Sequence, residues 1–224
     1  MIQLSLFPPE PQVQYRREHI PVVVVSPALG ELRPLLRHAR LLEHAVSGED
    51  VGRLSVALRE HQAILLDTMR LPPVRLAQLL VWLGRQVEHQ RMLSGIAALV
   101  DRADGITPIL LSSASIALPH LLVEELATRR DELRELPSTV CVPQPPLGLP
   151  AGFLEVFAAL EGASTIDEVA LRCHRSRSAT HRCLAATRAA LGLPAGHNVR
   201  YRPKVLLAEI LTALRQLAKA GGSC

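Results

Sequence analysis

The amino-acid sequence predicts an α/β domain followed by a smaller all-α domain, and three observations support this division. Short apolar runs at residues 21–26 and 63–67 alternate with stretches of helical periodicity, the pattern of a parallel sheet with helical crossovers. Prolines cluster at residues 143–150, as in a stiff linker. Beyond that cluster, only helical periodicity and helix-capping signals remain.

Composition limits the class of protein. With 224 residues, of which 48% are hydrophobic, the chain is long enough to build a packed core. It contains no apolar run of the roughly 18 residues that a membrane-spanning helix needs, and it does not open like a secretory signal. The four cysteines show no CxxC spacing, so we expect reduced thiols and a cytoplasmic protein.

The first domain is expected to span residues 20–142, after a flexible, proline-containing arm at residues 1–19. Its first half has the order strand, helix, strand, helix, strand, over residues 21–26, 28–40, 41–46, 51–58 and 63–67. Asp67 ends the last of these strands. Because function collects at the carboxyl ends of parallel strands, Asp67 is a candidate functional residue.

The second half of this domain has a looser pattern. We expect a long helical stretch at 74–100, either one helix or two helices broken near Ser94-Gly95. A fourth strand at 107–113, a helix at 119–136 and a fifth strand at 139–142 follow. The long stretch carries an apolar stripe that fits either the protein core or a dimer surface: Leu76, Leu79, Leu80, Leu83 and Val87.

The all-α domain is expected at residues 152–218, after a linker at 143–151 and before a flexible tail at 219–224. Its first helix, 152–160, is expected to be amphipathic. Ser164 or Thr165 caps a second helix, with Glu168 placed for a capping box. After a turn at 173–175, a third helix begins with Ser176 as its N-cap and ends at Gly192. The last helix covers 204–217.

Positive charge is concentrated in this second domain. Residues 1–150 hold 15 basic and 16 acidic side chains, whereas residues 151–224 hold 10 basic and 5 acidic ones, a net charge of +5. The segment 169–208 contains no acid at all. Such a segment attracts polyanions, so nucleic acid is favoured over an ordinary solvated surface.

A capped helix, a short turn and a further helix that begins with arginines form the pattern of a helix-turn-helix module. Residues 153–193 resemble the DNA-binding domain of NarL/LuxR-type regulators at Leu160, Glu168-Val169-Ala170, Ser176 and Leu191-Gly192-Leu193. The resemblance implies that the start of the recognition helix contacts bases or phosphates and that later residues grip the phosphate backbone. The first group is Arg175, Ser176, Arg177, Ser178, Thr180, His181 and Arg182, and the second is Arg188, Arg200, Tyr201, Arg202 and Lys204.

Residues 20–146 resemble a response-regulator receiver domain, which has a flavodoxin-like α/β fold. The resemblance rests on the strand at 22–26, the Ser-Gly-Glu opening at 47–49 and the segment 64–72 with Asp67 in the phosphoacceptor position. In the family, an acidic pair after the first strand holds magnesium and a lysine contacts the phosphoryl group. Here Ser26-Pro27 and Gln144-Pro145 occupy those places, so Asp67 is expected to be a vestige rather than a switch.

Two further motifs have alternative interpretations. The arm segment Gln3, Leu4, Ser5, Leu6 and Phe7 resembles the bacterial sliding-clamp-binding pentapeptide, or else packs back onto the protein. Cys173, His174, His181 and Cys183 cluster in sequence, but their spacing fits no usual zinc site, and we expect the cysteines to be core residues.

We therefore expect a cytoplasmic, homodimeric DNA-binding transcriptional regulator that acts without catalysis, cofactor or metal. Its receiver-like domain would serve dimerisation or signal input. The alternative is a replication or repair accessory protein that holds DNA with its basic domain and reaches the sliding clamp through the arm.

Overall fold

The computed structural model describes residues 22–26, 28–38, 45–47, 63–88, 96–100, 105–129, 139–140, 148–194 and 202–221. Several expectations concern residues outside these ranges. They are the N-terminal arm with Gln3, Leu4, Leu6 and Phe7, the helix at 51–58, most of the linker, Arg200 and Tyr201.

A five-stranded, all-parallel sheet forms the centre of the first half of the chain, in the order β2-β1-β3-β4-β6. Its strands are β1 (Val22–Ser26), β2 (Ala45–Ser47), β3 (Ala63–Asp67), β4 (Ile96–Val100) and β6 (His120–Leu122). The continuous apolar sequences of β1 and β3 suit central strands that are covered on both faces. The strand order reverses between β1 and β3, and Ser26 and Asp67 end these two strands side by side.

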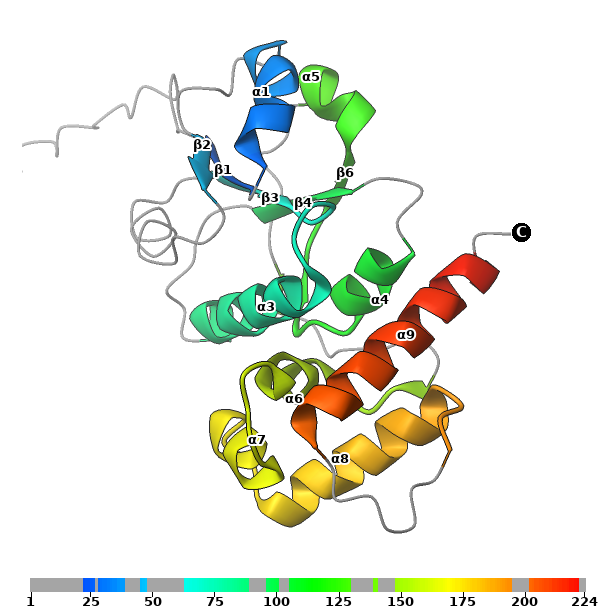
Figure 1. The fold of residues 1–224 in the computed structure, drawn as a ribbon. Helices are drawn as coiled ribbons and strands as arrows, with labels where there is room; N and C mark the ends of the chain where they lie inside the picture. The colour runs from blue at the N-terminus through cyan, green and yellow to red at the C-terminus, as the bar shows by residue number, and fades with distance from the viewer. Residues whose placement is uncertain are drawn as a thin grey trace, which may run out of the picture.

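Helices cover both faces of the sheet (Figure 1). On one face lie α1 (Leu29–His38), the short η3 (Val123–Glu125) and α5 (Leu126–Arg129). On the other face lie α3 (Pro73–Glu88) and α4 (Ile106–Ser112). A separate antiparallel pair, β5 (Ile116–Ala117) with β7 (Thr139–Val140), lies outside the main sheet.

Two segments of this half have the opposite secondary structure to the one that the sequence predicts. The helical stretch expected at 74–100 ends at Glu88, and residues 96–100 form β4 instead. The strand expected at 107–113 is the helix α4, in which Thr107, Leu110 and Leu111 are buried on one side. Short apolar runs of this length fit a strand or a helix equally well, and the partner surface decides between them.

The prediction of a helix at 119–136 is also wrong for the first residues of this segment. Residues 120–122 form β6, which pairs in parallel with β4, and helical structure begins only at η3 and α5. The strand expected at 139–142 is present as β7, but it pairs with β5 rather than joining the main sheet.

Four helices make up the C-terminal part: α6 (Phe153–Leu160), α7 (Ile166–Arg172), α8 (Arg177–Ala190) and α9 (Pro203–Gly221). The predicted caps are confirmed. The Thr165 hydroxyl accepts a hydrogen bond from the backbone N–H of Glu168, and the Ser176 hydroxyl accepts one from Ala179. After α8, Gly192 has a φ of +66°, a conformation that glycine adopts without strain.

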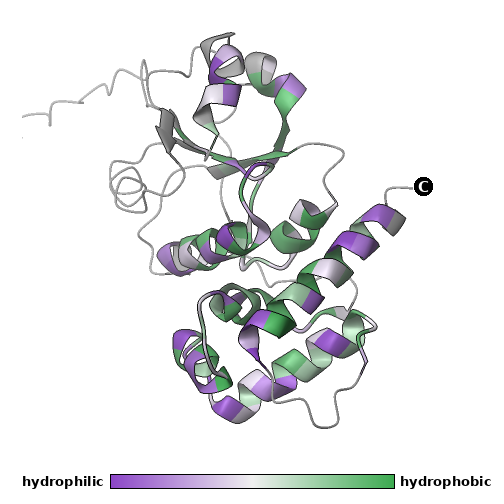
Figure 2. Cartoon of the chain, in the orientation of Figure 1, coloured by the Kyte–Doolittle hydropathy of each residue, from purple (hydrophilic) through white to green (hydrophobic). Residues whose placement is uncertain are grey.

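The helix α6 is buried on all sides rather than amphipathic. Seven of its eight residues are buried, all except Glu155, because α6 lies between α3 on one side and α7, α8 and α9 on the other. Figure 2 shows α6 as hydrophobic along most of its length. The surface that the sequence suggested as solvent-facing is therefore covered by the α/β part of the chain.

The junction between the two parts is apolar and hydrogen-bonded. Gln78 of α3 donates to the carbonyl of Ala158 (3.2 Å) and to the Glu161 carboxylate (3.0 Å). One continuous cluster of buried side chains extends from β3 through α3 and α6 to α9. Leu76, Leu79, Leu80 and Leu83 belong to it, so the interpretation of their stripe as core is confirmed.

None of the helices in the described part of the chain is long and apolar enough to cross a membrane.

Candidate nucleic-acid interface

The helices α7 and α8 meet at a tight turn that ends in a capped helix start. His174 in this turn has a φ of +53°, and the Arg175 backbone N–H donates to the carbonyl of Ala170, which closes the end of α7. Ser176 then caps α8. These local bonds connect α7 to α8, and the first turn of α8 carries exposed side chains at Arg177 and Ser178.

The start of α8 presents polar side chains to solvent. Arg177, Ser178 and Arg182 are exposed, and His181 between them is half-buried. The later exposed positions are all small: Ala185, Ala186 and Ala189. In Figure 1, α8 lies at the end of the molecule opposite the sheet, so its exposed face points away from the α/β part.

Charge on this surface is only partly compensated. Arg177 Nε lies 3.2 Å from the carboxylate of Asp167 on α7, and both side chains are largely exposed. Arg182, Arg202 and Lys204 are exposed and form no ion pair with any residue that the structure describes. Exposed pairs such as Arg177–Asp167 contribute at most about 1 kcal/mol, so a phosphate can replace the carboxylate at little cost.

Two predicted contact residues are buried instead. Thr180 has no exposed surface, and its hydroxyl donates to the Ser176 carbonyl. The Arg188 guanidinium is also buried, and donates to the Glu209 carboxylate of α9 and to the Pro194 carbonyl, each at 2.6 Å. Both predictions are corrected: Thr180 packs inside the helical group, and Arg188 ties α8 to α9.

Arg175 points toward the junction with α3 rather than along the exposed face of α8. Its side chain is 33% exposed, and Nη2 lies 3.9 Å from the Glu155 carboxylate. The guanidinium also covers Gly152, where a Cβ would meet it at 2.2–2.3 Å. Arg175 therefore belongs to the junction, and we remove it from the predicted contact surface.

The two cysteines of this region lie in the core, as expected. Cys173 and Cys183 are buried and free, and the Cys173 thiol donates to the Glu155 carbonyl. Burial raises the pKa of the Cys173 thiol to about 11 and also raises the pKa of Cys183. Within the described ranges, no three His, Cys, Asp or Glu side chains gather as metal ligands.

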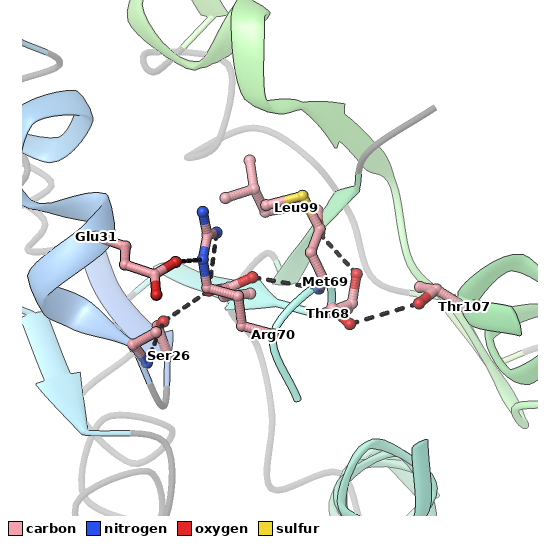
Figure 3. Close-up of polar contacts among 9 residues, drawn as sticks. Ser26, Glu31, Thr68, Met69, Arg70, Leu99 and Thr107 are labelled. Atoms are coloured by element: carbon pink, nitrogen blue, oxygen red, sulfur yellow. Dashed lines mark hydrogen bonds and ion pairs between the residues drawn. The ribbon is translucent and has the colours of Figure 1, made fainter. Parts of the chain in front are cut away.

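Asp67 lies in a closed polar network at the carboxyl ends of β1 and β3, and Figure 3 shows its partners Ser26, Met69 and Arg70. Its side chain has no exposed surface. The Ser26 hydroxyl donates to Oδ2 (2.6 Å) and the Met69 backbone N–H donates to Oδ1 (3.2 Å). Arg70 lies 3.5 Å from Oδ2 and bonds to Glu31 at 2.8 Å.

The described groups that contact the Asp67 carboxylate are hydrogen-bond donors rather than hard oxygen ligands for a metal. The hydroxyl of Ser26 stands where a second carboxylate would be needed to bind a divalent cation, and it donates a hydrogen bond to Asp67. The Glu31 carboxylate, with Asp67, raises the pKa of Arg70, which stays a fixed counter-charge. Asp67 therefore acts here as a structural hydrogen-bond acceptor, covered and already paired.

Some of these features had no signal in the sequence. Glu209 is the only acid in the last helix, but its pairing with Arg188 depends on how α8 and α9 cross. The pairing of Arg177 with Asp167 likewise depends on how α7 and α8 pack, because Asp167 lies in the first turn of α7 and Arg177 begins α8.

No protein-family model matches this chain, and no curated protein or solved structure is similar to it.

Proposed function

We propose that this chain is a DNA-binding transcriptional regulator in which α8 enters the major groove. The observation that carries the proposal is the capped, arginine-bearing start of α8, exposed on the side away from the α/β part. A helix is one of the few elements that fit the major groove, and its first turns reach the base edges. Arg177, Ser178 and Arg182 are the residues that read bases.

The phosphate backbone is held by the second set of exposed cations. Arg202 and Lys204 flank the start of α9, and Arg202 is exposed immediately before the helix begins. Backbone contacts of this kind position the protein without reading sequence. The small face formed by Ala185, Ala186 and Ala189 permits a close approach of the remaining turns of α8 to the duplex.

The α/β part is proposed to be a receiver-like, flavodoxin-like domain without a working phosphorylation site. Its strand order, β2-β1-β3-β4-β6, corresponds to the 2-1-3-4-5 order of flavodoxin-like sheets, which supports this assignment. The closed Asp67–Ser26 network supports a role in signal input or assembly rather than in phosphotransfer.

We further propose that the protein is cytoplasmic and binds DNA as a homodimer, because two half-sites multiply a modest single-site affinity. The dimer surface has to lie outside the stripe Leu76, Leu79, Leu80 and Leu83, because these four side chains are buried in the core of the chain.

The test is genome-wide DNA enrichment with the wild-type protein and with Arg177→Ala plus Arg182→Ala. Both side chains are exposed, so the double variant should fold normally and lose its specific sites. The matched control is Arg33→Ala plus Arg215→Ala, which removes two exposed charges on α1 and on the half of α9 that faces α4. Unchanged occupancy in the first variant would contradict the proposal.

A further inference from the structure

The junction between α3 and the helical group contains two adjoining hollows. One has a volume of 150 Å³ and the other a volume of 230 Å³, and they share Val81 and Arg85 of α3, Glu155 of α6 and Cys173 at the end of α7. We call them together the junction cleft. One wall belongs to the α/β part, and the other to α6 and the turn before α8.

The charged side chains that line the junction cleft are not fully paired with one another. Arg85 is exposed and forms no ion pair with any residue that the structure describes. The Arg175 guanidinium lies 3.9 Å from Glu155 Oε2, too far for a hydrogen bond, and Oε2 itself is buried without a hydrogen-bond partner. Among the described side chains that line the cleft, Arg85 and Arg175 therefore face one carboxylate, Glu155, which gives these three groups a net charge of +1.

The third arginine on the wall is already occupied. Arg172 donates to the carbonyls of Glu161 and Gly162 and pairs with the Glu168 carboxylate. Arg85 and Arg175 are consequently the two groups with free donors, and a carboxylate is the small group that guanidinium donors hold best.

An apolar surface adjoins these arginine side chains. Trp82, half-buried, lines the larger hollow together with Val81 and the methyl groups of Ala158 and Ala159. A flat apolar group can lie against this wall while an attached carboxylate reaches Arg85 and Arg175. Small-molecule sites commonly combine such an apolar wall with a few polar groups, and they occur preferentially between domains.

We propose that the junction cleft binds a small carboxylic acid with an aromatic or apolar body, as the input ligand of the regulator proposed above. Arg85 and Arg175 hold the carboxylate, and Trp82 and Val81 contact the apolar body. The assignment of the ligand as a regulatory input rests on the proposed function, whereas the binding site itself stands on the geometry of the cleft.

Arg175 connects this site to the DNA-reading helix. It lies in the turn immediately before Ser176, the N-cap of α8, and its guanidinium covers Gly152 at the start of α6. A bound carboxylate draws this guanidinium away from Glu155, and the turn is the element through which the change reaches α8. By linkage, a ligand that alters DNA affinity has its own affinity altered by the same factor when DNA binds.

The first experiment measures ligand binding to the full chain without DNA, by calorimetry and by Trp82 fluorescence, since Trp82 is the only tryptophan. The probe is benzoate, and benzamide is its uncharged counterpart. We expect benzoate to bind with a dissociation constant on the order of 1 mM, as for other ligands of this size. Benzamide should bind at least about tenfold more weakly, because it lacks the charge that the arginines recognise.

Variants locate the site. Arg85→Gln and Arg175→Gln should each weaken benzoate binding by about tenfold or more, whereas Arg33→Gln, which removes an exposed charge on α1, should leave it unchanged. Because Arg85 is exposed, its variant should fold normally. Equal binding of benzamide, no binding of benzoate, or full binding by Arg85→Gln would overturn the proposed site.

The second experiment repeats the measurement in the presence of DNA that the protein selects from a random pool. A change in benzoate affinity supports the regulatory role, and an unchanged affinity contradicts it. If the protein selects no DNA while benzoate binding depends on Arg85, the proposed function fails and the ligand site stands, so the two failures are distinguishable.

Discussion

At the scale of single residues, burial decides which of the charged side chains can act. Arg177 and Arg188 are both arginines of α8, yet one is exposed beside Asp167 and the other is enclosed between Glu209 and Pro194. A guanidinium that is enclosed in this way, with Nη1 bonded to Glu209 and Nη2 to Pro194, stabilises the crossing of two helices and is covered from a phosphate outside. Exposure and pairing together, rather than charge alone, define the interface.

Asp67 illustrates the same point for an acid. A carboxylate with no exposed surface that accepts hydrogen bonds from Ser26 and Met69 is held in place by the fold. From the sequence, Asp67 is expected to be a vestige, because the acidic pair and the lysine of receiver domains are missing. The structure adds the replacement, a hydroxyl donor at 2.6 Å.

Cys173 gives a prediction for reactivity at this scale. Burial raises the pKa of its thiol to about 11, from an unfolded value near 9. At pH 8 the folded protein therefore carries about a hundredfold less thiolate at this position than the unfolded chain, and alkylation should slow accordingly. Peptide mass spectrometry after iodoacetamide treatment, with and without denaturant, measures the ratio.

The sign for stability follows from the same shift. The folded state favours the protonated thiol. The contribution of Cys173 to the free energy of unfolding is therefore fully present below pH 9 and is lost as the pH rises through 9 toward 11. Equal alkylation rates for Cys173 in the folded and unfolded chain would show that this region opens readily.

At the scale of elements, the side-chain caps fix the starts of α7 and α8. Ser176→Ala removes the side-chain acceptor for the Ala179 backbone N–H, and we expect a loss of about 1 kcal/mol in the free energy of unfolding. Ser176→Asn restores an acceptor and should recover most of that loss. Urea titrations of the three proteins measure it, and an alanine variant as stable as the wild type would mean that the cap does not set the start of α8.

Elements with strong local signals were predictable from the sequence, and short apolar ones were not. The caps at Thr165 and Ser176 and the C-terminal Gly192 lie where side-chain chemistry placed them. By contrast, residues 96–100 and 107–113 are apolar runs of five and seven residues without a usable period, and they were assigned the wrong way round. Their structure depends on the neighbouring strand β3 and on α3, which no local rule includes.

The interface was predictable in part for a related reason. The exposure of the start of α8 follows from its N-cap and its charge, and Arg177, Ser178 and Arg182 are exposed as expected, whereas their contact with DNA stays a prediction. The burial of Thr180 and Arg188 and the turn of Arg175 toward α3 result from the packing of α9 and α3 on the helical group. Long-range packing of this kind leaves no periodic trace in the sequence.

At the scale of the whole molecule, the two parts share one core. With α6 buried against α3 and a continuous apolar cluster from β3 to α9, separation would expose Leu80, Leu83 and Leu154 to water. We expect a single unfolding transition in which Trp82 fluorescence and far-UV circular dichroism change together. Two separate transitions would show that the parts fold independently.

The contact between Gly105 and Ala218 provides a variant that tests how α9 packs against α4. A Cβ at Gly105 would lie 2.8 Å from Ala218 Cα and 3.0 Å from its carbonyl oxygen, so Gly105→Ala forces α9 away from α4. We expect it to lower the free energy of unfolding by about 1–3 kcal/mol. Gly30→Ala is the matched control, because nothing lies within 4 Å of its Cβ position, and it should be neutral or slightly stabilising.

The salt dependence of DNA binding tests the central claim, that the exposed start of α8 holds a duplex, most directly. Fluorescence anisotropy with a selected duplex at a series of salt concentrations yields the slope of log affinity against log salt. For Arg177→Ala plus Arg182→Ala, the slope should become shallower by up to about two units and the affinity should fall at every salt concentration. The Arg33→Ala plus Arg215→Ala control should match the wild type. Parallel lines of equal affinity for all three proteins would contradict the account.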